Sequence, residues 1–216
     1  MHELFDQFLE PFQNSDKERC VSLTMKWLQE KKIDTISLYE KILSPALATI
    51  ECDVAAKEQS IWKEHLKTAI VRTIVECSYP YVLAEKKDEF GADWKGKVAV
   101  FCPDGEYHEL GARMVSDFFT RLGYQSSFVG KSTPKEEILN LAMTLKPDFL
   151  AMSITNVYNL VAAKKAIDFL KNHGVDLPVY VGGAALNHND AAFHEESGLI
   201  LIQTFSQLKL ALKGSE

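Results

Sequence analysis

The sequence is poor in cysteine and has no long apolar run. Its four cysteines are scattered, with no CxxC pair and no cysteine–histidine cluster: Cys20, Cys52, Cys77 and Cys102. This spacing argues against a zinc site or a disulfide framework, so we expect reduced thiols that fill core space. No apolar run approaches the roughly 20 residues of a membrane helix. The first residues also lack the basic and apolar parts of a signal peptide. A cytoplasmic location without membrane contact is therefore expected.

The sequence also lacks a surplus of positive charge. Lysine and arginine total 24 against 30 acidic residues, which gives a formal net charge of −6. Because proteins that bind nucleic acid must neutralise phosphates, direct nucleic-acid binding is not expected. The remaining composition, with 46% hydrophobic and 25% charged residues, is typical of a folded globular protein.

Helical periodicity dominates residues 1–88, which we interpret as one domain. Helices are expected at about 2–10, 16–31, 34–50 and 57–85. Ser15 and Glu18 would form the capping box of the second helix, Asp34 or Ser37 would begin the third, and Pro45 would bend it. Four helices with short connections predict an antiparallel bundle. The charged, glycine-punctuated stretch 85–96 is interpreted as a connector.

Strands alternate with helices in residues 96–216, the second expected domain. Strand-like runs occur at 97–102, 125–129, 149–154, 179–181 and 199–204. Helical runs occur at about 108–122, 134–145, 158–173 and 205–213. This alternation predicts a parallel sheet with helices on both faces. The whole chain is expected to be α/β, with an N-terminal four-helix bundle followed by a doubly wound, Rossmann-like (flavodoxin-like) sheet of five parallel strands.

Three common uses of a doubly wound sheet lack their motifs here. Ligands of such sheets bind beyond the carboxyl ends of the strands. The loop after the first strand has no GxGxxG, which disfavours a dinucleotide. Gly130-Lys131-Ser132 lacks the earlier glycine of a phosphate-binding loop, and Ser153 stands where a receiver domain has its phosphorylated aspartate. NAD binding, nucleotide hydrolysis and phosphotransfer are therefore not expected.

Three other short elements do stand at the ends of predicted strands. They are Glu106-x-His108-x-x-Gly111, Ser153-x-Thr155 and Gly182-Gly183, separated by 41 and 26 residues. Their order and spacing resemble the cobalamin-binding domain of methionine synthase, corrinoid methyl carriers and cobalamin-dependent photoreceptors. Because a helical bundle precedes that domain in the family as well, the resemblance covers nearly the whole chain.

The resemblance assigns His108 as the lower axial ligand of cobalt, replacing the cofactor's own base. Imidazole is a common ligand of transition metals, so the residue type suits this role. Glu106 would accept the other ring N–H and fix the tautomer of His108. Gly111 would permit close approach of the displaced nucleotide tail.

The resemblance also assigns the remaining elements to that tail. Ser153 would hydrogen-bond the buried benzimidazole, and Thr155 would line its channel. Gly182 and Gly183 would let the tail pass against bare backbone.

The bundle carries a second resemblance, to CarH-type photoreceptors, which bind adenosylcobalamin and lose the adenosyl group in light. In that group a tryptophan precedes a Glu-His pair by ten residues, and Glu64-His65 matches the pair. Val54 replaces the tryptophan, and Ala55 replaces a histidine that can bind cobalt after photolysis. Trp62 lies on a different helix face from Glu64 and does not simply substitute. Val54 would leave a larger upper cavity, open to another upper ligand, to solvent or to His65.

These resemblances imply a protein that holds cobalamin base-off and His-on, between the bundle and the Rossmann-like domain. We expect a sensory module responsive to light or to its upper ligand. It would lack a DNA-binding domain of its own and act through a protein partner or self-association. Adenosylcobalamin is the expected form, with methylcobalamin or hydroxocobalamin as alternatives. A corrinoid methyl carrier of a methyltransferase system is the other candidate. A haem sensor is disfavoured because haem has no nucleotide tail, and no turnover enzyme is expected from the chain alone.

Overall fold

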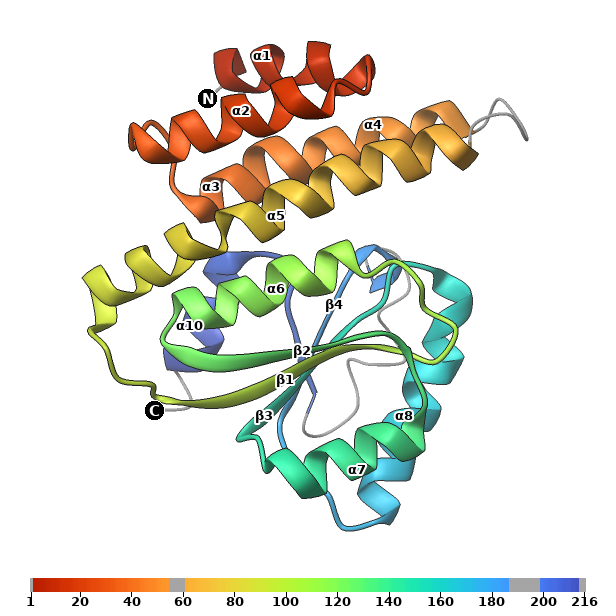
Figure 1. Ribbon diagram of the computed structural model, residues 1–216. Coiled ribbons are helices and arrows are strands. Elements are labelled where there is room, and N and C mark those ends of the chain that lie inside the picture. The colour runs from red at the N-terminus through yellow and green to blue at the C-terminus, as the bar shows by residue number, and fades with distance from the viewer. Residues whose placement is uncertain (1, 55–60, 187–198, 214–216) are drawn as a thin grey trace. The chain divides into compact units, whose positions relative to one another are not determined.

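The computed structural model describes residues 2–54, 61–186 and 199–213; the side chains of 51–54 and 61 lie outside the description. The chain divides into two compact units, Met1–Asp88 and Glu89–Glu216, and each is described by itself (Figure 1). Within these ranges, no helix combines the length and the hydrophobicity that a membrane crossing needs.

The first unit is a helical bundle. Its elements are α1 (His2–Gln13), α2 (Lys17–Gln29), α3 (Thr35–Leu38), η1 (Tyr39–Leu43), α4 (Ser44–Val54) and α5 (Ile61–Phe90). Since α3, η1 and α4 follow one another without a break, they form the single third helix that the sequence predicts. The core of the bundle contains fully buried aromatic and aliphatic side chains: Phe8, Phe12, Leu38, Tyr39, Ile42, Leu43, Val71 and Ile74.

The caps of these helices differ in part from expectation. The capping box of Ser15 and Glu18 is wrong: Asp16 is the N-cap of α2, and its carboxylate accepts from Arg19 N–H at 3.0 Å. Ser15 lies in the left-handed region with φ 56°, where it ends the preceding turn instead of starting the next helix. Asp34 does cap α3, accepting from Ser37 N–H at 2.7 Å.

The expected bend at Pro45 takes the form of a wide helical turn. Residues Tyr39–Leu43 are π-helical, and Ser44 N–H donates to Tyr39 O, five residues back. Proline has no N–H and its ring crowds the carbonyl four residues earlier. A single wider turn before Pro45 lets the helix continue past that carbonyl.

The fourth helix continues further than the sequence analysis expected. α5 extends through the charged stretch to Phe90, and Gly91 follows it with φ 77°. The residues after Glu85 are mostly good helix formers. A glycine in the left-handed conformation is a common helix stop. The predicted start of the connector at residue 85 is therefore wrong, and the non-helical segment begins at Gly91.

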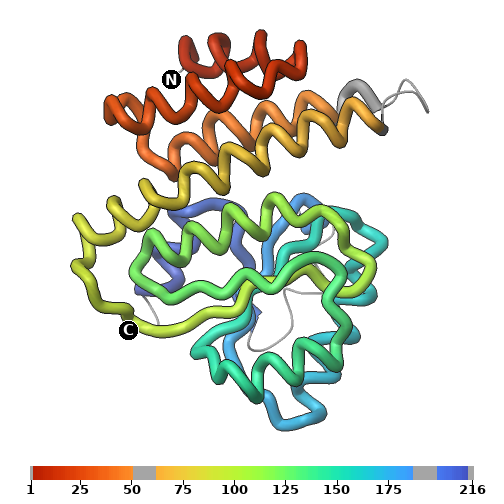
Figure 2. The backbone as a smooth tube through the Cα atoms, in the orientation of Figure 1, coloured from red at the N-terminus to blue at the C-terminus, as the bar shows by residue number. Residues whose placement is uncertain are grey.

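The second unit is a five-stranded parallel sheet. Its strands are β1 (Gly96–Pro103), β2 (Tyr124–Thr133), β3 (Phe149–Ser153), β4 (Val179–Gly182) and β5 (Leu199–Leu201), in the order β2-β1-β3-β4-β5. The connecting helices are α6 (Leu110–Arg121), α7 (Lys135–Leu145), α8 (Leu160–Asn172) and α10 (Phe205–Lys213). α6 and α10 cover one face and α7 and α8 the other, as the ribbon and the backbone tube show (Figures 1 and 2). The expected doubly wound sheet is confirmed.

The sheet has a distinct core on each face. Toward α7 and α8 the core is aliphatic, built around Leu150, Val181 and Ile167. Elsewhere four aromatic rings meet edge to face, with centroids 5.4 to 6.4 Å apart: Phe119, Tyr124, Phe149 and Tyr180. These cores fix β1, β3 and β4 side by side, so the loops after them begin at one edge of the sheet.

Candidate functional site

The candidate site lies where β1, β3 and β4 end. β1 and β3 are direct neighbours, and Ser153 at the end of β3 is in register with Gly182 at the end of β4. The loop after β1 carries Glu106 and His108, and the turn η2 (Val157–Asn159) follows β3. The parallel topology therefore brings together three motif elements that are far apart in the sequence.

The carboxylate of Glu106 holds His108 in place. Glu106 Oε1 lies 2.5 Å from His108 Nδ1 and also accepts from His108 N–H at 2.9 Å. The Glu106 side chain is fully buried, whereas 53% of the His108 side chain is exposed. The ring is therefore anchored on one side and accessible on the other.

The second oxygen of Glu106 is held by the segment after β3. Oε2 accepts from Thr155 N–H at 2.9 Å, from Asn156 N–H at 2.8 Å and from the Asn159 side-chain amide at 3.0 Å. Because a carboxylate is acceptor-only when ionised, this many donors select the ionised form.

The pKa values around the site follow from these contacts. Burial alone would raise the pKa of Glu106, but hydrogen bonds from the His108 ring, Asn156, Asn159 and His108 N–H outweigh it and lower this pKa to about 2. Burial raises the pKa of the nearby Cys102 thiol to about 12, and the charges of Glu106 and Glu109 add to that rise. Cys102 is therefore a protonated thiol, whereas Glu106 carries a negative charge.

An ionised Glu106 determines which nitrogen of His108 can act as a ligand. A neutral imidazole has one N–H and one lone pair. Glu106 favours the tautomer with the proton on Nδ1, which places the lone pair on Nε2. A carboxylate that accepts the other ring N–H is the usual support of a metal-binding histidine. The pair therefore has the chemistry of a metal-binding histidine supported by a carboxylate.

The backbone of the loop is fixed by the end of β2. Glu106 N–H donates to Pro103 O, and Glu106 O accepts from Ser132 N–H, both at 2.9 Å. The Ser132 hydroxyl accepts from Gly105 N–H at 3.0 Å. Ser132 has a left-handed φ of 47°, a conformation that is costly for a serine and is maintained by these bonds.

Ser153 and Gly111 form a second contact of the site. Ser153 is buried, and a Cβ built on Gly111 would lie 3.4 Å from Ser153 Oγ. Within the described residues, Ser153 Oγ has no hydrogen-bond partner. This hydroxyl can donate one hydrogen bond and accept others, so it suits a ligand atom such as a nitrogen of a base.

The glycine pair has no space for side chains. A Cβ on Gly182 would lie 2.5 Å from Ile202 O, and one on Gly183 would overlap the backbone of Ile154. Gly183 also has φ 113°, a conformation for which only glycine is suited. Gly183 O in turn accepts from Leu186 N–H at 3.1 Å, within the turn η3 (Ala184–Leu186).

Outside comparisons identify this half of the chain. The family model described as "B12 binding domain" matches residues 96–202. Residues 96–202 are a B12-binding domain. The Methanosarcina barkeri "Methanol--corrinoid protein" is 30% identical over 105 residues, which cover 48% of this chain and 41% of that protein. The cofactor class of the domain is therefore cobalamin or a related corrinoid.

Two further relatives extend beyond the B12-binding domain. The "HTH-type transcriptional repressor CarH" of Myxococcus xanthus is 27% identical over 168 residues, 72% of this chain and 50% of the repressor. The chain thus spans half or less of these curated relatives. The solved structure of the Methanosarcina barkeri monomethylamine corrinoid protein has a TM-score of 0.82 at 19% identity, over 99% of both chains. That likeness shows a shared fold.

The structure places the predicted residues in two groups. Seven lie together in the B12-binding domain: Glu106, His108, Gly111, Ser153, Thr155, Gly182 and Gly183. The other four belong to the first unit. Trp62 and His65 are exposed and Glu64 is partly buried on α5, while Val54 ends α4 with its side chain outside the described residues.

Sequence reasoning missed Asn159, which holds both Glu106 Oε2 and Gly105 O through one amide nitrogen. It also gave no role to Ser132 or to the backbone of Asn156. A weak signal was present, because Asn156 and Asn159 follow directly on Ser153-x-Thr155.

The residues of the site fit a metal whose other ligands come from a macrocycle. Within the described residues, no group of three or more His, Cys, Asp or Glu side chains could hold a bare ion. One histidine is sufficient when a macrocycle such as corrin supplies the equatorial ligands.

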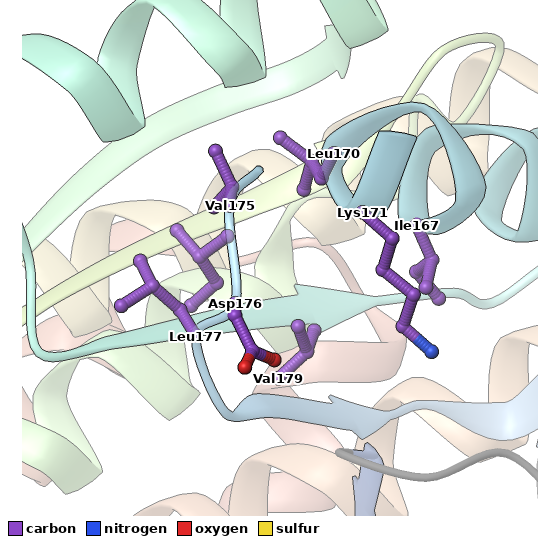
Figure 3. Close-up of a pocket in the computed structure, with 8 residues that line it drawn as sticks. Ile167, Leu170, Lys171, Val175, Asp176, Leu177 and Val179 are labelled. Atoms are coloured by element: carbon purple, nitrogen blue, oxygen red, sulfur yellow. The ribbon is translucent and has the colours of Figure 1, made fainter. Parts of the chain in front are cut away.

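A small cavity lies away from the site. It has a volume of about 20 Å³ and is lined by Leu170, Val175 and Val179 among others, at the start of β4 (Figure 3). Ligand pockets occupy about 300–1,000 Å³, so this cavity is too small to hold a cofactor.

Proposed function

We propose that the chain binds cobalamin with His108 Nε2 as the lower axial ligand of cobalt and with the cofactor's own base displaced. The observation that carries this proposal is the fully buried carboxylate of Glu106, which anchors His108 Nδ1 at 2.5 Å. When bound, the cofactor would supply a reactive cobalt centre. The residues of the chain hold and orient it.

The displaced tail is proposed to lie along Gly111, Ser153, Thr155 and the Gly182-Gly183 pair. Ser153 Oγ would form one hydrogen bond with the base, for which a hydroxyl can serve as donor or acceptor. The glycines would allow the tail to pass close to the backbone, because neither has a side chain.

We infer a sensory role, in which light or exchange of the upper ligand changes the assembly or partner binding of the chain. The match to CarH supports this role. It covers 72% of the chain, which is more than residues 96–216 make up, so the matched region extends into the bundle. Trp62 and Leu66 on α5 are 59% and 47% exposed, and His65 is exposed beside them. These side chains are available to a ligand or a partner, and adenosylcobalamin is the proposed form.

The second candidate is a corrinoid methyl carrier that acts with a partner methyltransferase. Similarity to the "Methanol--corrinoid protein" and the whole-chain fold likeness to the monomethylamine corrinoid protein favour it. His108, Glu106 and Ser153 would have the same roles in it.

Absorption spectra test these proposals. The full chain is loaded in the dark with adenosyl-, methyl- or hydroxocobalamin and measured before and after illumination. A His-on spectrum that is lost in His108→Ala supports the proposed ligand, and binding unchanged by that substitution rejects it. An irreversible light response of the adenosyl form, with a change in oligomeric mass, supports the sensor. Methyl- or hydroxocobalamin binding without adenosyl binding supports the carrier.

A further inference from the structure

The last turns of α5 belong to different compact units. The boundary between the units falls between Asp88 and Glu89, inside one uninterrupted helix that continues to Phe90 (Figure 1). A domain boundary normally falls in an exposed, irregular linker. Here the chain crosses it as a helix.

The bundle holds α5 at Glu85. The two carboxylate oxygens of Glu85 accept from Thr35 N–H at 3.0 Å and from Thr35 Oγ1 at 2.6 Å. Thr35 is fully buried at the start of α3. A carboxylate at a helix N-terminus is favoured by its unpaired N–H groups and by the helix dipole. This contact is the first clamp.

The B12-binding domain holds α5 from Glu89 onward. Glu89 Oε2 lies 2.7 Å from Arg121 Nη1 at the end of α6, and Oε1 lies 2.9 Å from Lys209 Nζ on α10. One carboxylate therefore ties the last turn of α5 to two helices of the domain. This contact is the second clamp.

The segment after α5 is also fastened to the domain. Lys95 N–H donates to Gly123 O at 2.8 Å, and Lys95 Nζ lies 4.5 Å from the centre of the Phe90 ring. Glycine and charge made this stretch the expected connector between the units. Since both of its ends are held by the second unit, bending within it would not move the bundle.

We propose that the joint between the two units is the single helical turn Lys86–Asp88, held between the Glu85–Thr35 clamp and the clamp of Glu89 with Arg121 and Lys209. Any rotation of the bundle relative to the B12-binding domain then requires this turn to bend or unwind. Because the turn is part of an α-helix, unwinding it would break the i to i−4 hydrogen bonds that cross the joint. The joint is independent of the proposed cofactor and of the sensor or carrier role.

The test compares a glycine in the joint with a glycine in the segment after it. Lys87 is exposed on the joint and Asp93 is exposed outside the helix. Lys87→Gly should raise the hydrogen-exchange rates of amides 86–90 about fivefold relative to Lys87→Ala, because glycine destabilises an exposed helix relative to alanine. Asp93→Gly should leave those rates unchanged.

Distances between spin labels give the second readout. Labels are placed at exposed Glu18 in the first unit and at exposed Glu137 in the second, with Cys52 and Cys77 replaced by serine. Lys87→Gly and the clamp variant Glu89→Gln should broaden the distance distribution, and Asp93→Gly should not. A broadening caused by Asp93→Gly, or no broadening by either joint variant, would overturn the proposal.

Discussion

The carboxylate of Glu106 is fully buried and accepts hydrogen bonds from five donors, and this makes its charge essential. Glu106→Gln replaces one acceptor oxygen by an NH₂ group that must face N–H donors on whichever side it lies. A buried unsatisfied polar group costs about 1–3 kcal/mol, so we expect the free energy of unfolding to fall by about that amount. The exposed neighbour Asp104→Asn should change it by less than about 0.5 kcal/mol. Urea denaturation of both variants measures the difference.

The same substitution should also weaken the histidine as a ligand. Without an ionised Glu106 the Nδ1–H tautomer of His108 loses its support. Loss of the residue that hydrogen-bonds a metal-binding histidine typically lowers the metal affinity about 10–100-fold. Cobalamin titrations followed by absorption would show it. Equal affinity in Glu106→Gln and Asp104→Asn would contradict the proposed role of Glu106.

The cysteines give a prediction that is independent of the cofactor. Cys20 and Cys102 are buried, and burial raises the pKa of each thiol to about 12. Cys77 is exposed on α5. Because the thiolate is the reactive form, iodoacetamide at pH 8 should label Cys77 far faster than the two buried thiols. Peptide mass spectrometry measures this, and comparable labelling of Cys102 in the folded chain would show that the loop over it opens.

Sequence reasoning identifies those site residues that belong to short, contiguous motifs. Glu106 and His108 are two residues apart, so their pairing needs only a local loop. Asn159 contacts Glu106 across 53 positions. That contact depends on β1 and β3 being neighbours and on η2 turning the amide inward, which no local pattern encodes.

At the scale of elements, the turn after β4 depends on Gly183. Gly183→Ala would place a Cβ on the Ile154 backbone at φ 113°. Gly174 is a matched control, because it has φ 76° but nothing within 4 Å of its Cβ position. Gly174→Ala should cost about 1–2 kcal/mol from the left-handed conformation alone. Gly183→Ala should cost clearly more, because backbone must shift.

Thermal and urea unfolding of the two alanine variants would separate these effects. If Gly183→Ala were no less stable than Gly174→Ala, the close approach between β3 and β4 would not be a constraint. A loss of cobalamin binding in Gly183→Ala at a concentration where the chain remains folded would support the path proposed for the tail.

Elements were predictable where local chemistry alone decides them. Asp34 caps α3 as the residue type predicts. Ser15 fails as a cap because its neighbour Asp16 takes that position, and two adjacent capping residues are equivalent by pattern. The connector was predicted to begin too early because its charged residues were taken to indicate a loop, although lysine and glutamate are good helix formers. Only Gly91 marks the end of α5.

At the scale of the whole molecule, the order of strands and helices follows from the sequence, because alternating elements and right-handed crossovers permit few topologies. The Glu89 contact does not follow from it. Glu89 joins α5, α6 and α10, and its partners Arg121 and Lys209 are distant in the chain. Such contacts between elements decide how the last turn of α5 is held within the second unit.

Glu89 therefore also gives a pH prediction. The hydrogen bond from Lys209 and then that from Arg121 lower the pKa of Glu89 against the opposing effect of burial. A lowered pKa in the folded state stabilises the fold above the ordinary carboxyl value and loses this effect as pH falls through the lowered pKa. Because the Glu89 side chain is 38% exposed, the effect at pH 7 should be about 0.5 kcal/mol.

Urea unfolding of wild type and Glu89→Gln at pH 7 and at pH 3 measures this contribution. We expect wild type to be more stable at pH 7, with a difference that shrinks at pH 3 because the Glu89 carboxylate binds a proton more readily in the unfolded chain than in the folded one. High salt should also reduce the difference, since exposed charges are screened. Exposed Glu137→Gln, which has no ion pair among the described residues, is the matched control and should differ little at either pH. A wild-type advantage that grows on acidification would contradict the assignment, because an ion pair that depends on ionised Glu89 can only weaken as protons bind it.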